Sequence, residues 1–346
     1  MLAFVTGGTG LLGSNLVRQL LHDGHTVRVL ARSKEKASLQ LADLDESARE
    51  RYSIVVGDLS DVSAFAASLE GVDIVFHTAA YFREYYQPGD HWTELERLNV
   101  RATQAVIESA AQVGVPAFLH VSTLGVIGMK PGGEPGDEST PPSAAQLGNL
   151  YFRSKYAADE VIDELEAKSD IRIVTVHPGW MFGPGDAAPT SAGALVIQFL
   201  RREIPGVPPG GMNVADVRDV SIGAIRAAER GGAGSHFILG GPYVSVKEIF
   251  ASLARVSGVP SPRIVLPPRV LESVAWLGEK LAVLRRRPAR ISLEGVRMFQ
   301  LEMRVSSARA EQELGVTFRP LEETLRDTIE WFRSHGMLSD LHYRSA

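Results

Sequence analysis

Glycine spacing near the start of the chain constrains its fold more than any other feature. A short apolar run at 2–5 precedes Thr6-Gly7-Gly8-Thr9-Gly10-Leu11-Leu12-Gly13, and apolar residues then recur at helical spacing. This pattern predicts a strand, a tight turn and a helix that begins near Leu11. Gly7 would permit the turn, Gly10 a close approach of backbone to ligand, and Gly13 close packing of helix on strand. The N–H groups at the helix start would bind phosphates, so the segment predicts a dinucleotide site.

The amino-acid composition argues against several classes of protein and several kinds of site. The chain has 346 residues, 45% of them hydrophobic and 22% charged, which is typical of a globular protein. A formal net charge of -5 argues against a nucleic-acid partner, which would need a basic face. The absence of cysteine excludes disulfides, thiolate metal ligands and a thiol nucleophile, and we expect no metal site. Because the first strand pattern begins at residue 2 and no long apolar run follows, we expect no signal peptide, no membrane span and a cytoplasmic location.

Strand and helix patterns alternate in the first half of the chain. This alternation predicts an α/β fold with a Rossmann-type, doubly wound parallel sheet. The Pro- and Gly-rich stretch 129–148 is expected to form a loop over the site. The strands that follow the first are expected at 26–30, 54–56, 73–76, 117–121 and 171–176, and helices at 62–69 and about 90–113.

The last third of the chain shows helical patterns with little strand signal, at 217–230, 245–256, 270–284 and 321–334. We expect residues 1–178, with a sheet completed by later segments at about 213–240, to form the dinucleotide-binding domain. Residues 179–212 and 241–346 would form a smaller, mostly helical, substrate-binding lobe. The helix at 270–284 runs into Arg285-Arg286-Arg287 and could touch an anionic membrane surface, although a lobe helix with a solvated basic end explains it more simply.

Three residues carry the predicted chemistry. Tyr151 and Lys155 lie four apart at the start of a helical pattern, so both emerge on one face. An ammonium beside a phenol favours its ionised form, which would suit the pair to acid–base work on a carbonyl or an alcohol, although many helices carry such a pair by chance. Thr123 follows the strand 117–121 at the carboxyl end, where open parallel sheets bind ligands, and its hydroxyl could hold a substrate oxygen. Neighbouring Ser122 should point to the opposite side, and both hydroxyls could instead satisfy turn backbone.

Taken together, these residues resemble the extended short-chain dehydrogenase/reductase family. The glycine motif at 6–13, Thr123 after the fifth strand and Tyr151-x-x-x-Lys155 stand in that family's order, and further matches lie at 57–59, 77–80, 99–100 and 177–185. The chain is most similar to the dihydroflavonol 4-reductase-like branch, which includes proteins labelled as NDP-sugar or hopanoid-associated sugar epimerases. Thr123 stands where serine is commoner in the family, which preserves the hydroxyl.

The resemblance implies a role for each matched position. Tyr151 would be the general acid/base, Lys155 would bind the nicotinamide ribose and favour the ionised phenol, and Thr123 would orient the substrate carbonyl. Asn99 would support a proton relay, whereas His77 is expected only to pack. A homodimer built from the helices that carry Asn99 and Tyr151 is also implied. The remaining cofactor contacts would come from Gly7, Thr9, Gly10, Leu11, Leu12, Gly13, Asp58, Leu59, Thr78, Ala79, Ala80, Pro178, Gly179 and Met181.

The end of the second strand bears on the choice of cofactor. It reads Val29-Leu30-Ala31-Arg32, with no carboxylate to bind the adenosine ribose hydroxyls. Arg32, with nearby Lys34 or Lys36, would instead meet a 2′-phosphate. The sequence therefore favours NADP(H) over NAD(H), unless Arg32 is simply a solvated loop residue.

The leading hypothesis is an NADPH-dependent reductase of an aldehyde or ketone, with Tyr151 as proton donor. The alternative is an NDP-sugar epimerase or dehydratase with retained NAD(P). Such relatives commonly grip the diphosphate with an arginine where this chain has Met212, although Arg201, Arg202 or Arg218 could substitute. A non-catalytic nucleotide sensor is less favoured, because Tyr151 and Lys155 are both present.

Segments expected to cover the site are rich in aromatic and apolar residues. They favour a substrate with apolar or ring character, although such residues more often serve plain packing. These residues are Tyr81, Phe82, Tyr85, Tyr86, Trp92, Met129, Trp180, Met181 and Phe182.

Overall fold

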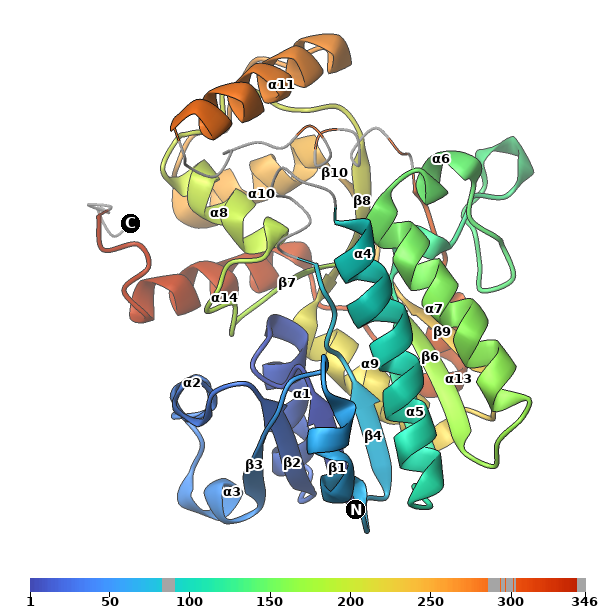
Figure 1. The fold of residues 1–346 in the computed structure, drawn as a ribbon. Helices are drawn as coiled ribbons and strands as arrows, with labels where there is room; N and C mark the ends of the chain where they lie inside the picture. The colour runs from blue at the N-terminus through green and yellow to red at the C-terminus, as the bar shows by residue number, and fades with distance from the viewer. Residues whose placement is uncertain (83–90, 286–292, 294–295, 297–300, 302, 341–346) are drawn as a thin grey trace.

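A parallel sheet organises the first two-thirds of the chain (Figure 1). The computed structural model describes residues 1–82, 91–285, 293, 296, 301 and 303–340. Within this part, seven strands pair in the order β3-β2-β1-β4-β5-β6-β9, every neighbouring pair parallel. This order is that of a Rossmann-type sheet, as the alternating sequence pattern predicts. The strands are β1 (Leu2–Thr6), β2 (Thr26–Ala31), β3 (Tyr52–Val56), β4 (Ile74–His77), β5 (Ala117–Val121), β6 (Arg172–Pro178) and β9 (Ser235–Leu239).

Helices cover both faces of the sheet because successive strand residues point to opposite sides. On β1, Ala3 and Val5 join the apolar core beneath α1 (Leu11–His22) and α9 (Val217–Arg230). Phe4, between them, joins the core on the other face, beneath α5 (Ala102–Gln112) and α7 (Leu150–Glu166). The strands are therefore apolar on both sides, which makes their sequences nearly continuous hydrophobic runs.

The glycine turn has the predicted conformation. Gly7 has φ +69, a left-handed value that suits glycine, and its carbonyl accepts a 2.9 Å hydrogen bond from the N–H of Gly10. Helix α1 then begins at Leu11. A methyl group at Gly13 would collide with the Gly7 carbonyl, so only glycine lets α1 pack this closely on the turn.

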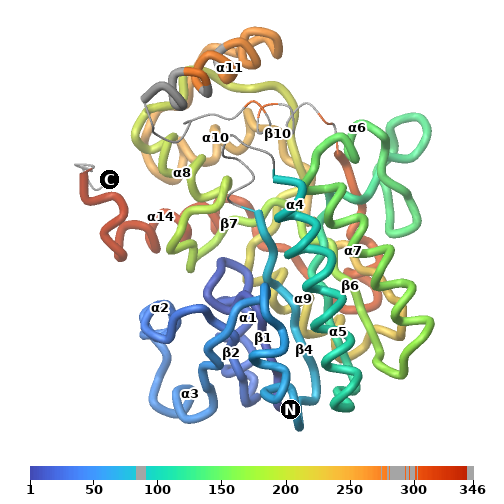
Figure 2. The backbone as a smooth tube through the Cα atoms, viewed as in Figure 1, coloured from blue at the N-terminus to red at the C-terminus, as the bar shows by residue number. Residues whose placement is uncertain are grey.

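A helical region lies above the carboxyl ends of the strands in the view of Figures 1 and 2. Among the residues that the structure describes, a small second sheet pairs β7 (Trp180–Phe182), β8 (Gly211–Asp216) and β10 (Tyr243–Ser245). Its apolar core is shared with three helices, α8 (Ser191–Leu200), α10 (Val246–Ser257) and α14 (Leu321–Ser334). The other helices are α2 (Lys34–Gln40), α3 (Glu46–Glu50), α4 (Trp92–Leu95), α6 (Ala144–Leu147), α11 (Pro268–Arg285) and α13 (Ala308–Leu314).

Two predicted helices differ from the structure. The segment 62–69 forms two short 3-10 turns, Val62–Ala64 and Ala66–Leu69, because Phe65 between them leaves helical geometry and turns its ring into the core. The helix expected at about 90–113 begins at Trp92 within the described part and contains a π-helical stretch, η4 (Glu96–Arg101), before α5. A π-helical turn shifts the facing of the side chains that follow it, which a uniform helical period does not predict.

The proline-rich stretch 129–148 does not cover the site. None of its residues lines the cavity described below. The stretch packs on the edge of the main sheet instead, where the Glu138 carboxylate accepts a 2.9 Å hydrogen bond from the N–H of Ile238 on β9. Gly136 pairs with Val305, and Gln146 donates to the carbonyls of Gly125 and Ile127. The Glu138 contact satisfies one N–H on the edge strand β9, and the other contacts fix the loop to neighbouring segments.

Candidate active site

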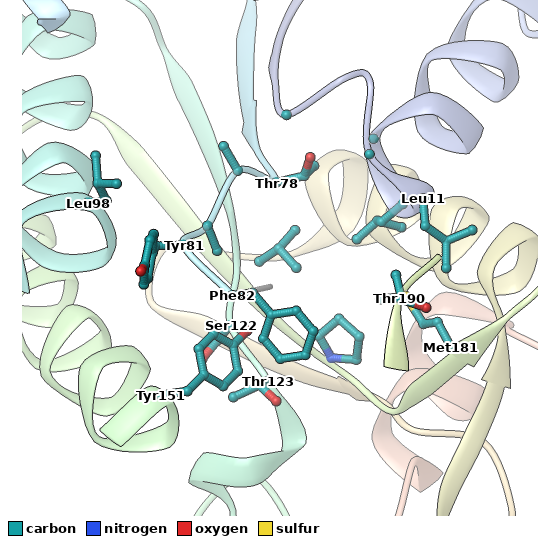
Figure 3. Close-up of a pocket in the computed structure, with 18 of the residues that line it drawn as sticks. Leu11, Thr78, Tyr81, Phe82, Leu98, Ser122, Thr123, Tyr151, Met181 and Thr190 are labelled. Carbon is teal, nitrogen blue, oxygen red and sulfur yellow. The ribbon is translucent and has the colours of Figure 1, made fainter. Parts of the chain in front are cut away.

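A cavity of about 460 Å³ lies where the carboxyl ends of the parallel strands meet the helical region (Figure 3). This size is that of a typical small-molecule site. Its walls come from the turns after β1, β2, β3, β4, β5 and β6 and from residues of the helical region. The lining includes Gly7, Thr9, Gly10, Leu11, Leu12, Gly13, Arg32, Asp58, Leu59, Thr78, Ala79, Ala80, Thr123, Tyr151, Pro178, Gly179 and Met181.

The glycine turn forms the floor of one part of this cavity. Among the described residues, no side chain caps the N-terminus of α1, and Leu11, Leu12 and Gly13 all line the cavity. A Cβ at Gly7 would lie 2.7 Å from the N atom of Ala79, so only glycine lets the turn pack this closely on the chain after β4. Uncapped N–H groups at the positive end of a helix fit a pyrophosphate without any basic side chain.

Arg32 lies at another end of the cavity, directly after β2. Its side chain is 81% exposed, and its Nε atom lies 3.9 Å from the Asp58 carboxylate, which is itself 43% exposed. The Ser60 N–H donates a hydrogen bond to Asp58 and lowers the pKa of that carboxyl. An exposed pair at this distance holds Arg32 weakly. The guanidinium can therefore turn towards an anionic ligand in the cavity.

Tyr151, Thr123 and Phe82 gather at one side of the cavity in Figure 3. The phenol ring of Tyr151 packs edge-on against Phe82, with ring centroids 4.7 Å apart. The Thr123 hydroxyl accepts a 3.3 Å hydrogen bond from the N–H of Gly125 and keeps its donor hydrogen available. The Tyr151 side chain and the Thr123 hydroxyl therefore line the same part of the cavity.

Ser122 directs its hydroxyl elsewhere. Its Oγ atom donates a 2.7 Å hydrogen bond to the buried carboxylate of Asp159 on α7. The expectation that neighbours on this strand end point to opposite sides agrees with these partners. Both residues line the cavity, but of the two hydroxyls it is that of Thr123 which keeps a donor hydrogen for a ligand.

Lys155 lies behind the wall of the cavity and is not one of its lining residues. It is 2% exposed, and its Nζ atom donates to the Val121 carbonyl at 2.7 Å and lies 3.2 Å from His120 Nε2. Burial lowers the pKa of Lys155 to about 8, an effect that the Asp159 carboxylate opposes. An ammonium with such a pKa can exchange protons near neutral pH.

Asn99 and His77 are both buried and do not line the cavity. The amide of Asn99 is fully engaged: it accepts from the N–H of Tyr81 at 2.7 Å and donates to the Tyr81 carbonyl and to Ser154 Oγ. It therefore fixes the chain after β4 against α7. The ring nitrogens of His77 lie 2.9 Å from Thr6 Oγ1 and 3.0 Å from Thr103 Oγ1, so this histidine packs, as expected from its motif.

The model of the NAD dependent epimerase/dehydratase family matches residues 3–240, more than half of the chain. This chain belongs to that family. Its members are enzymes that use a nicotinamide dinucleotide, and the chain is accordingly an NAD(P)-dependent enzyme of oxidoreductase or epimerase type.

Relatives of this epimerase/dehydratase family member match nearly its whole length. A Synechocystis sp. protein provisionally named dihydroflavonol 4-reductase is 35% identical over 96% of this chain and 95% of its own. Sterol demethylase protein B of Methylococcus capsulatus is 31% identical over 98% of this chain and 100% of its own. The crystal structure of gox2253 superposes with a TM-score of 0.80 at 33% identity, covering 97% of this chain and 98% of that one.

Several lining residues were not predicted. Met212 and Met303 come from segments far apart in the sequence, and no local pattern marks either as part of a site. Thr190 and Ser191 line the cavity at the start of α8, where Ser191 Oγ accepts from the Trp180 ring nitrogen at 3.1 Å. The serine and threonine at a helix start were a usable signal, because such residues cap helices and face the neighbouring cleft.

The predicted covering residues divide into three groups. Tyr81, Phe82, Trp180 and Met181 line the cavity. Phe182 is buried in the core of the helical region, and Trp92 and Met129 lie away from the cavity. Tyr85 and Tyr86 fall outside the described residues.

Two further features can be stated for the described part of the chain. No helix there combines the length and the apolarity that crossing a membrane requires. No group of three or more histidine, aspartate or glutamate side chains there is arranged to hold a metal ion.

Proposed function

We propose that this family member is an NADP(H)-dependent reductase of an aldehyde or ketone that carries a large apolar or ring-containing group. The observation that supports this most is the character of the cavity beside Tyr151. Apolar and aromatic side chains surround that end, contributed by Phe82, Leu124, Trp180, Met212 and Met303. Such a surface favours an apolar substrate over a sugar nucleotide.

The position of the basic residues supports the same choice. Met212, at the place where related epimerases commonly carry a diphosphate-binding arginine, is 4% exposed and lines the cavity. Two of the three candidate substitutes are engaged elsewhere: Arg218 pairs with Asp216 and Asp327, and Arg201 with Asp340. The third, Arg202, does not line the cavity. Apart from Arg32, no described lysine or arginine lines the cavity. A sugar diphosphate would thus lack a cationic partner near Tyr151.

The names of two relatives agree with a substrate that contains fused rings and a carbonyl group. One is named for a flavonol-type substrate and the other for a sterol. We propose that residues 179–212 and 241–346 bind the substrate, while residues 1–178 with part of 213–240 bind the dinucleotide. A bound cofactor would supply hydride to the carbonyl carbon. The Tyr151 phenol would then give its proton to the carbonyl oxygen, which the Thr123 hydroxyl orients.

The experiment that tests this proposal compares cofactors and substrates directly. Purified protein is incubated with NADPH or NADH and a panel of ring-bearing aldehydes and ketones, and NADPH consumption is followed by absorbance. Net oxidation of NADPH matched by alcohol formation supports the reductase. Interconversion of NDP-sugar epimers without net cofactor turnover would instead establish the alternative.

Replacement of Tyr151 by Phe tests the proton donor. The variant keeps the ring contact with Phe82 but loses the acid, so turnover should fall by about 10²–10⁴-fold while the Kd for NADPH stays within about twofold. Tyr156→Phe is the matched control, because Tyr156 lies on the same helix outside the cavity and should leave turnover unchanged. Full activity in Tyr151→Phe would refute the assigned role.

A further inference from the structure

Three side chains connect the surface at the sheet edge with the turn that carries Thr123. Asp163 is on α7, His236 on the edge strand β9 and His177 on β6, the neighbour of β9. His236 Nε2 lies 3.4 Å from Asp163 Oδ1, and His236 Nδ1 lies 3.0 Å from His177 Nε2. The other ring nitrogen of His177, Nδ1, lies 3.4 Å from the Thr123 carbonyl oxygen. Each link is therefore a direct contact between polar atoms.

The two ends of this series decide which ring nitrogens carry hydrogen. A carbonyl oxygen and an ionised carboxylate can only accept hydrogen bonds. His177 Nδ1, which faces the Thr123 carbonyl, and His236 Nε2, which faces the Asp163 carboxylate, must therefore each carry a hydrogen. One more hydrogen lies between His177 Nε2 and His236 Nδ1. The two rings then hold three hydrogens on four nitrogens, so the pair carries one positive charge.

The positive charge of the pair lies on His236. His177 is 2% exposed, and burial lowers its pKa to about 4 against the opposing charge of Asp159. The His236 side chain is 24% exposed. Burial and the charge of Arg309 act to lower the pKa of His236, but its hydrogen bond to Asp163 raises that pKa above the ordinary value. His177 is thus a neutral imidazole that donates from Nδ1 and accepts at Nε2 from the His236 imidazolium.

The Thr123 carbonyl receives hydrogen bonds from two directions. The N–H of Val126 donates to it at 3.3 Å, and His177 Nδ1 donates from the other strand. An oxygen with two lone pairs can accept both. Val126 belongs to the same 3-10 turn, η5 (Leu124–Val126), that Thr123 caps, so its bond shapes the turn but does not fix the turn to the sheet. His177 is part of β6, and its bond ties the Thr123 backbone to that neighbouring strand.

This bond lies directly behind two walls of the cavity. Thr123 lines the cavity after β5, and Pro178 and Gly179, which follow His177 in the chain, line it after β6. His177 itself is not a lining residue. The Thr123 hydroxyl that faces the cavity is held from within its own turn by the N–H of Gly125, so its place relative to β6 depends on the backbone bond to His177.

We propose that His177 is a positioning residue for carbonyl reduction, which holds the Thr123 backbone through Nδ1–H in the tautomer that His236 and Asp163 fix. The inference rests on the proposed function, in which the Thr123 hydroxyl orients the substrate carbonyl. His177 lines no part of the cavity, so it acts through Thr123. Because a small misplacement of an orienting group slows the chemical step, the effect belongs to kcat rather than to cofactor affinity.

The first test measures the ring hydrogens by NMR in the full wild-type chain with ¹⁵N-labelled histidine. The signals of His177 and His236 are assigned by their loss in His177→Asn and His236→Asn. At about pH 6 we expect His177 to be neutral with its hydrogen on Nδ1, and His236 to carry hydrogen on both nitrogens. A His177 ring with its hydrogen on Nε2 alone would overturn the proposal. This readout does not depend on enzymatic activity.

The second test replaces His177 in three ways. His177→Phe keeps a ring but removes the donor, so kcat for carbonyl reduction should fall by about 10–100-fold while the Kd for NADPH stays within about threefold. His177→Asn places an amide N–H near the position of Nδ1 and should keep kcat within about threefold of wild type. His177→Gln places its amide near Nε2 instead, so it should lose as much as His177→Phe and replaces that variant if it folds poorly. Equal kcat values in His177→Asn and His177→Gln would overturn the proposal.

A double-mutant cycle separates action through Thr123 from general damage to the core. In Thr123→Ala, which lacks the positioned hydroxyl, adding His177→Phe should lower kcat by less than about twofold further. His77→Phe is the matched control, because His77 is also a buried histidine but its ring contacts Thr6 and Thr103, so its effect should be the same with and without the Thr123 hydroxyl.

Full additivity of His177→Phe and Thr123→Ala would overturn the positioning role while leaving the reductase intact. Wild-type protein that reduces no carbonyl would overturn the proposed function itself, and with it any role of His177 in that reaction. The NMR result distinguishes the two failures, because the ring hydrogens of His177 and His236 are measured without a substrate.

Discussion

Among the described residues, Arg32 is the basic side chain that lines the cavity and could bind a cofactor phosphate. Its exposed pairing with Asp58 is weak, so a 2′-phosphate could replace that partner with charge-assisted hydrogen bonds. We predict that Arg32→Ala raises the Kd for NADPH by about 10–100-fold and leaves the Kd for NADH nearly unchanged. Fluorescence titration of both cofactors measures this. Arg255→Ala, in an exposed ion pair outside the cavity, is the control. Equal affinities for the two cofactors, unaltered by Arg32→Ala, would contradict the preference for NADP(H).

Lys155 makes the reaction depend on pH in a predictable direction. Burial moves the pKa of its ammonium from 10.5 down to about 8. The ammonium form, whose charge favours the Tyr151 phenolate left after proton transfer, is therefore present below about pH 8 and lost as the pH rises through that value. We predict that kcat for carbonyl reduction declines above about pH 8, in a single deprotonation seen in a pH profile. Lys155→Arg should remove this decline, since a guanidinium stays protonated. A wild-type profile that is flat to about pH 10 would exclude Lys155 as the titrating group.

At the scale of elements, an ion-pair network joins the start of α9 to α14. Asp216 ends β8, is 0% exposed at its side chain, caps α9 through the N–H of Arg218 and pairs with the Arg218 guanidinium at 2.7 Å. Arg218 also lies 2.7 Å from Asp327 on α14. Because both Asp216 oxygens are engaged and buried, the network ties the main sheet's α9 to the helical region.

We predict that Asp216→Ala lowers the free energy of unfolding by about 3–5 kcal/mol, because it leaves a partly buried guanidinium without its main partner. Urea denaturation measures this. Glu330→Ala breaks an exposed pair on α14 and should cost about 0.5 kcal/mol or less.

Burial alone would raise the pKa of Asp216, but its hydrogen bonds from Arg218 lower it. The stabilisation is therefore present above the ordinary carboxyl pKa and is lost as the pH falls, so wild type and variant should converge in acid. A gap that widens in acid would contradict this origin.

Some elements were easier to predict from the sequence than others. The helices α9 and α14 were predicted with the bounds that the structure has, because each carries a strong apolar stripe with Asp216 and Pro320 before it. The short strands β8 and β10 gave little signal because, in the described part of the chain, β8 lies between β7 and β10 in a small separate sheet, and such pairing is set by the folded chain. In the site, local sequence patterns were enough to predict the glycine turn, Tyr151 and Thr123. Met303 was not, because only tertiary packing brings it to the cavity.

The interval of four residues from Tyr151 to Asp163 was visible in the sequence. The residues opposite this stripe of α7 were not, since His120, His177 and His236 come from three strands that are distant along the chain. A helix stripe shows which side chains share a face, but it does not show what opposes them. The contacts of this stripe and the walls of the cavity therefore both depend on the assembly of the whole sheet.

For the whole molecule, the cavity has walls from both the sheet and the helical region, so a bound cofactor should stabilise both together. We predict a single thermal unfolding transition, and we expect NADPH to shift the whole transition to a higher temperature. At about 100 times its Kd, NADPH should add about 2.7 kcal/mol to the free energy of unfolding, because it binds the native state alone. Differential scanning calorimetry with and without NADPH measures both quantities.

In Arg32→Ala the same NADPH concentration should give a smaller shift, because that concentration is then a smaller multiple of Kd, whereas the shift with NADH should be retained. Two separate transitions, only one of which responds to NADPH, would show that the helical region folds independently of the bound dinucleotide, and the contacts through Asp216 and Arg218 would then not couple the two parts.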